Sequence, residues 1–192
     1  MVTDDAAWML MEAVRLLNTP TRRLKMLELG NQHSGWNLSV PVRLVMEWLG
    51  MSHTSIDLNG LDGALVFDLS KPLPLYDDQF DVVTNYGTSE HCCTTGDFRD
   101  QWQVFKNIHE CAKPDSVMIH VVPNEVGAHC GSGYAYTQGF FPALAEACNY
   151  DLVQLYSSKS DKNHWAALLL CKPDSVFPSF EEFKDMGGIL RT

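Results

Sequence analysis

The sequence lacks the features that mark membrane-spanning and nucleic-acid-binding proteins. No run approaches the roughly 18 consecutive apolar residues that a membrane-spanning helix needs. Lys and Arg number 14 against 24 Asp and Glu, which gives a net charge of −10. The one basic cluster, Arg22, Arg23 and Lys25, is too small for the basic stripe that contacts a nucleic-acid backbone. We therefore expect no nucleic-acid or membrane partner, and a small molecule as the ligand.

The sequence also lacks a disulfide framework and a secretion signal. Its six cysteines show no regular spacing, and residues 1–5 are acidic where a signal peptide is basic. We expect free thiols in a reducing compartment and a cytoplasmic location. A length of 192 residues suffices for one domain with a full core. That domain is expected to span residues 1–192, with an N-terminal helix over 1–19 and a loosely attached tail over 173–192. Phe177, Phe180 and Phe183 are the candidate docking points of this tail.

Short apolar runs alternate with helical patterns along the chain. The helical patterns cover residues 4–18, 39–49, 98–112 and 139–147. The apolar runs that predict strands cover residues 25–29, 53–58, 64–68, 80–86, 117–122, 150–157 and 165–171, the last two as an antiparallel pair. This alternation indicates an α/β protein in which helices cover both faces of a mostly parallel sheet.

Acidic residues accompany the ends of three successive predicted strands. In an open parallel sheet, ligands bind at the carboxyl ends of the strands. Asp57 is placed to accept both hydrogen bonds of a ribose diol, and Asp68 to accept one from an adenine amine, with the Leu69 N–H facing the ring. Glu28 precedes the turn at Gly30, where a carboxylate attracts an ammonium group.

Several segments resemble the class I S-adenosylmethionine (SAM)-dependent methyltransferases, over roughly residues 24–172. The matching segments are Leu27–Gly30, Ile56–Leu58, Phe67–Leu69, Leu73–Val83, the pair Glu90-His91 and the turn Lys113–Asp115. The resemblance implies a Rossmann-like three-layer sandwich with a seven-stranded sheet whose last strand is antiparallel. It also implies SAM as the cofactor and methyl transfer to a small molecule.

The resemblance further implies a set of cofactor-binding residues. Asp57 would hold the ribose hydroxyls, and Asp68 with Leu69 the adenine. Glu28 and Gly30 would lie beside the methionine part of SAM, and Asn85 would contact that part or the incoming substrate. The full expected set is Glu28, Gly30, Gln32, Asp57, Leu58, Asp68, Leu69, Asn85 and Tyr86.

The loop after the first strand departs from the family pattern. That pattern continues with glycine at every second position, whereas Gln32 and Ser34 stand at the later glycine positions here. We expect Gln32 to donate its side-chain amide to the cofactor carboxylate and so replace a lost backbone contact. The alternative is that Gln32 crowds the site.

Two histidines are candidate general bases, a role needed only where the acceptor must lose a proton. His91 follows the fourth predicted strand, and His129 lies in the loop after the fifth. Adjacent cysteines follow His91, and Cys130 follows His129. Because zinc ligands in a pair are usually separated by two to four residues, we expect no metal.

Two other functions remain open. The altered glycine loop would suit a non-catalytic, methyltransferase-like binding or scaffold subunit. A NAD-dependent oxidoreductase would use Asp57 at its ribose, but the sequence lacks the second and third glycines of that motif and is short for an added substrate domain.

Overall fold

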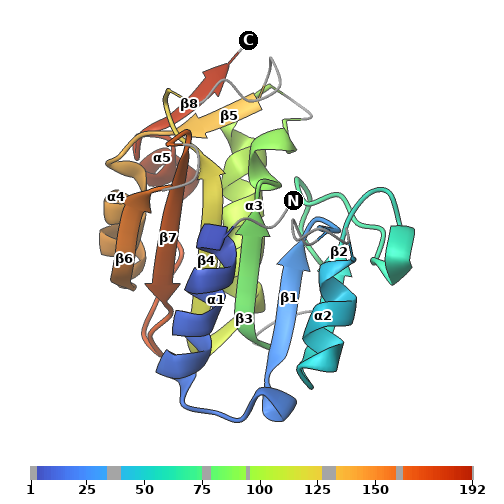
Figure 1. Ribbon diagram of the computed structural model, residues 1–192. Coiled ribbons are helices and arrows are strands. Elements are labelled where there is room, and N and C mark those ends of the chain that lie inside the picture. The colour runs from blue at the N-terminus through green and yellow to red at the C-terminus, as the bar shows by residue number, and fades with distance from the viewer. Residues whose placement is uncertain are drawn as a thin grey trace.

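The structure, a computed structural model, describes residues 4–33, 40–74, 79–93, 96–126, 133–158 and 162–191. A six-stranded sheet has the strand order β2-β1-β3-β4-β7-β6 (Figure 1). Its strands are β1 (Lys25–Leu29), β2 (Ser52–Ile56), β3 (Phe80–Tyr86), β4 (Ala112–Pro123), β6 (Asp151–Ser157) and β7 (His164–Leu170). Strands β2, β1, β3 and β4 are parallel, and β7 is antiparallel to both of its neighbours. The predicted antiparallel strand is therefore confirmed.

Helices cover both faces of this sheet, which confirms the α/β three-layer prediction (Figure 1). Helices α1 (Asp4–Leu17) and α2 (Val42–Trp48) pack on one face, and α3 (Phe98–Cys111) and α4 (Phe140–Cys148) on the other. Successive side chains of a strand point to opposite faces, so Met26 joins the core under α1 and α2 while Leu27 joins the core under α3 and α4. Both residues are fully buried, which explains the continuous apolar character of β1.

The sheet has six strands rather than seven because the predicted strand over residues 64–68 is reduced to one bridge. Leu65 pairs with Ile56, and its N–H donates to the Ser55 carbonyl oxygen at 2.8 Å. The connection from Ile56 to Leu65 is too short for the crossover helix that normally joins parallel strands. With no such helix to cover it, Val66 remains 62% exposed.

The C-terminal tail is docked through a strand and through Phe183, so loose attachment was wrong while Phe183 as a docking point is confirmed. Strand β8 (Gly188–Arg191) pairs antiparallel with β5 (Gly133–Tyr136), and helix α5 (Phe180–Phe183) precedes it. Phe183 is buried, with its ring centroid 5.7 Å from that of Phe105 on α3.

No helix in the described ranges is long and apolar enough to cross a membrane.

Candidate active site

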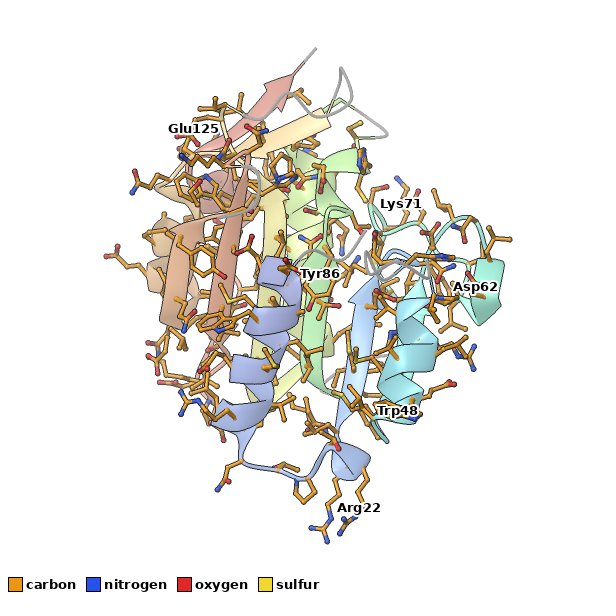
Figure 2. All side chains as sticks on the ribbon, viewed as in Figure 1. Arg22, Trp48, Asp62, Lys71, Tyr86 and Glu125 are labelled. Atoms are coloured by element: carbon orange, nitrogen blue, oxygen red, sulfur yellow. The ribbon has the colours of Figure 1, made fainter. Side chains whose placement is uncertain are left out.

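Strands β1, β2 and β3 run in parallel and end at one edge of the sheet, where a cavity of about 240 Å³ opens. Six residues of the expected cofactor set line it: Gly30, Gln32, Asp57, Leu58, Asp68 and Leu69. The candidate base His91 lines it too, together with Ile56, Phe67, Gly87, Thr88 and Cys92. Figure 2 shows Asp62 and Lys71 on the loops that follow β2 near this edge.

The Asp57 carboxylate holds two loops at the cavity wall. Its Oδ2 accepts a hydrogen bond from the Asn31 N–H at 2.9 Å, and its Oδ1 accepts one from the Asn59 N–H at 2.8 Å. A carboxylate has about four lone-pair sites, so two such bonds leave acceptor capacity for a ligand. Asp57 thus lies at the cavity with its orientation fixed by backbone donors on either side.

Asp68 is fixed by the next turn of the chain. Its Oδ1 accepts hydrogen bonds from the Ser70 hydroxyl at 2.6 Å and from the Ser70 N–H at 2.9 Å. The hydroxyl bond is the largest of the influences that lower the pKa of Asp68 below its usual value. Asp68 therefore presents a negative charge to the cavity at neutral pH.

Gly30 directly follows β1, and its backbone lies against the side chain of Thr88, which follows β3. Its φ is +82°, and a Cβ at this position would lie 2.4 Å from Thr88 Oγ1 and 3.0 Å from Gln32 Nε2. The Gly30 N–H already donates to the Ile56 carbonyl oxygen at 2.8 Å. Gly30 therefore contributes clearance at the cavity rather than a free N–H donor.

Gln32 extends over this glycine toward the end of β3. Its Nε2 donates to Thr88 Oγ1 at 3.4 Å, and the Thr88 hydroxyl donates to the Leu29 carbonyl oxygen at 2.8 Å. Sequence reasoning missed Thr88, although its position two residues beyond β3 follows the same strand-end rule that located the acids. The Gln32 side chain thus lies at the cavity, beside Thr88.

Glu28 lies inside the sheet and does not line the cavity. Its side chain and that of His53 on β2 are both fully buried, with Glu28 Oε2 lying 3.3 Å from His53 Nε2. Burial raises the pKa of Glu28, and the contact with His53 opposes this rise. Sequence reasoning did not identify His53, because His53 and Glu28 are far apart along the chain and no local pattern indicates their contact.

Asn85 and Tyr86 lie away from the cavity as well. Asn85 is buried and closes the turn after β3, since its Nδ2 donates to Ser89 Oγ at 2.8 Å and its Oδ1 accepts from the Ser89 N–H. Tyr86, labelled in Figure 2, faces α1 and lines a separate apolar cavity between α1 and α2. Contact of these two residues with a cofactor stays a prediction that this geometry does not favour.

His91 and Glu90 lie in the 3-10 helix Ser89–His91 that follows β3. The His91 side chain is 47% exposed at the cavity, and its Nε2 lies 3.9 Å from Glu90 Oε1. Glu90 is only 2% exposed, and burial raises its pKa to about 7. The other candidate base, His129, lies outside the described residues.

The described cysteines are all free thiols: Cys92, Cys93, Cys111, Cys148 and Cys171. In the same part of the chain, no group of three or more His, Cys, Asp or Glu side chains is arranged to hold a metal ion. Cys130 lies outside the described residues.

Comparison with solved structures decides the fold. An N1-methyltransferase from Burkholderia thailandensis, solved with 1,6-didemethyltoxoflavin and S-adenosylhomocysteine, has a TM-score of 0.59 at 14% identity over 88% of this chain and 80% of its own. The chain has the fold of the SAM-dependent methyltransferases. A TehB-like methyltransferase from Corynebacterium glutamicum (TM-score 0.54, 17% identity, 83% and 87% covered) shares it, as does a methyltransferase from Mesorhizobium loti (0.57, 13%, 84% and 97%). No family model and no curated protein matches the chain.

The residues at the cavity fit the ligand that this methyltransferase fold implies. The Gly30 turn leaves space that a Cβ would fill, and Asp57 and Asp68 present oriented carboxylate oxygens at the two following strand ends. These are suitable partners for the hydroxyl and amine donors of an adenosine.

Proposed function

We propose that this protein is a SAM-dependent methyltransferase that acts on a small molecule. The observation that carries the proposal is the convergence of Gly30, Asp57 and Asp68 at one cavity, in the order of the strands and on a methyltransferase fold. Asp57 would bind the ribose hydroxyls, and Asp68 with Leu69 the adenine. SAM supplies an electrophilic methyl group, and its cationic centres suit a cavity lined by carboxylates.

The small-molecule acceptor rests on charge and on analogy. A chain with net charge −10 repels nucleic acid and anionic surfaces. A structural neighbour was solved with 1,6-didemethyltoxoflavin, which supports the same class of acceptor by analogy of fold. The free thiols support the proposed cytoplasmic location.

Calorimetry with SAM, S-adenosylhomocysteine and NAD tests the cofactor. We expect both sulfur ligands to bind and NAD not to bind. Asp57→Asn should weaken S-adenosylhomocysteine binding, whereas the control Asp174→Asn, at an exposed position outside the cavity, should leave it unchanged. No binding of either sulfur ligand at millimolar concentration would overturn the proposal, and binding of NAD alone would favour an oxidoreductase.

A non-catalytic binding subunit is the second candidate, and the observation that favours it is Gln32 lying over Gly30. Mass spectrometry of a metabolite panel incubated with SAM separates the two functions. Methylated product supports the enzyme, whereas tight S-adenosylhomocysteine binding without any product supports the binding subunit.

A further inference from the structure

The buried carboxyl group of Glu90 lies in a turn that is rigidly held. Ser89 Oγ and the Tyr136 hydroxyl on β5 are hydrogen-bonded at 2.8 Å, and Gln101 Nε2 on α3 donates to the carbonyl oxygens of Ser89 and Cys92. Within the described part of the chain, neither carboxyl oxygen of Glu90 accepts a hydrogen bond from another residue. A buried carboxyl group in this state costs free energy, so its presence beside the cavity calls for a reason.

Two glycines allow this turn to lie directly behind the cavity wall. Gly87, which lines the cavity, has φ +66°, and a Cβ there would lie 3.3 Å from Glu90 Oε1. Gly133 at the start of β5 approaches from the other side, where a Cβ would lie 2.6 Å from the Glu90 carbonyl oxygen. Gly87 thereby lets the Glu90 carboxyl group lie close behind the cavity wall, and Gly133 lets β5 lie close to the Glu90 backbone.

The groups around Glu90 leave His91 as its cationic partner. Burial raises the pKa of Cys92 to about 12 and that of Tyr136 well above its usual value, so both are neutral. The negative charges of Asp68 and of Asp100, a residue of α3, act on the neighbouring Cys92 and add to the rise of its pKa. Of the basic side chains in the described ranges, His91 is the one within 4 Å of Glu90.

We propose that Glu90 is a positioning residue that orients His91 and stabilises its imidazolium form, so that His91 removes a proton from the methyl acceptor. The proposal rests on the proposed methyltransferase function and narrows its substrate class to acceptors whose reacting oxygen or nitrogen carries a hydrogen. When such an atom uses its lone pair to form a bond to the transferred methyl carbon, the bond between that carbon and the sulfur of SAM breaks. The electron pair of the broken bond stays on the sulfur. The X–H proton then passes to the His91 imidazole, and water removes it from the imidazolium afterwards.

NMR titration of the His91 imidazole tests the charge coupling without any cofactor. An opposite charge within 4–6 Å favours the charged form, so Glu90→Gln should lower the His91 midpoint by about one pH unit. The control Glu146→Gln, at an exposed position on α4, should leave it unchanged. An unchanged His91 midpoint in Glu90→Gln would overturn the proposal.

The pH dependence of methylation tests the catalytic consequence. In Glu90→Gln the acidic limb of the kcat profile should move by the same amount as the His91 midpoint, while S-adenosylhomocysteine affinity stays within twofold. A shifted His91 midpoint with an unshifted kcat profile would overturn the role in proton transfer. Failure of the wild-type protein to bind S-adenosylhomocysteine would instead overturn the proposed function, while the cofactor-free titration would still report on the Glu90–His91 pair.

A reciprocal measurement tests the same coupling without replacing Glu90. The ¹³C resonance of the Glu90 carboxyl group should titrate about one pH unit higher in His91→Gln than in the wild-type protein, because the nearby positive charge is lost. Equal midpoints in the two proteins would overturn the proposal.

Discussion

Replacing Glu90 by glutamine is expected to stabilise the fold, and to do so more strongly at high pH. The Glu90 carboxyl group is buried, and burial raises its pKa from 4.5 to about 7. Between these values the folded state binds more protons than the unfolded state, so the free energy of unfolding falls as the pH rises through this window. Glutamine keeps the shape of the protonated side chain but does not ionise, so the variant avoids this loss.

The two pKa values set the size of the effect. Each unit of difference corresponds to about 1.4 kcal/mol once the pH is above both values. Linkage then predicts that Glu90→Gln is more stable than the wild-type protein by about 3 kcal/mol at pH 8, but only by about 1 kcal/mol at pH 5.

Urea unfolding at the two pH values measures this difference directly. Glu146→Gln is the matched control, and because Glu146 is exposed it should change stability by less than about 0.5 kcal/mol at either pH. An equal effect of Glu90→Gln at pH 5 and pH 8, or destabilisation at pH 8, would refute the assignment of Glu90 as a buried carboxyl group that loses its proton near neutral pH.

Three further predictions concern the cavity, and calorimetry with S-adenosylhomocysteine measures each. Gly30→Ala should abolish measurable binding and destabilise the fold by about 2 kcal/mol, since it combines an unfavourable positive φ with a contact to Thr88 Oγ1. Adding Thr88→Ala removes that contact but leaves the positive φ, so it should recover only part of the stability. Full recovery would show that the backbone is not strained. Asp57→Asn should weaken binding by about 1–3 kcal/mol through the loss of an acceptor, which is about fivefold to 150-fold in Kd, and unchanged affinity would remove Asp57 from the site. Gln32→Ala should weaken binding about threefold to tenfold if the amide donates to the ligand, at about 1 kcal/mol per hydrogen bond, whereas tighter binding would show that Gln32 crowds the site.

The residues at the strand ends could be predicted because residues that follow neighbouring parallel strands lie close together, even when they are far apart along the chain. Strands β1 and β2 appear in the sequence as short apolar runs, and parallel neighbours end at the same edge of the sheet. Locating the runs was therefore enough to bring Gly30, Asp57 and Asp68 to one cavity, even though Asp68 follows a single bridge rather than a strand.

The direction of individual side chains was harder to predict. Neighbouring residues in a strand point to opposite faces, so an assignment that is correct to within one residue still leaves the face undecided. Tyr86 illustrates this, because it ends the expected strand but faces α1 instead of the cavity. The pairing of Glu28 with His53 and the hydrogen bonds of Thr88 depend on contacts between distant segments, which no local pattern specifies.

The two backbone bonds to Asp57 have a consequence for how this site can change in evolution. The carboxylate expected to recognise a ribose also joins the loop at Asn31 to the loop at Asn59. A substitution that altered ligand preference at this position would loosen both loops at the same time. Preference for a ribose and the order of the cavity rim are therefore inherited together, and a descendant of this chain that abandoned adenosine ligands would first need another way to hold its rim.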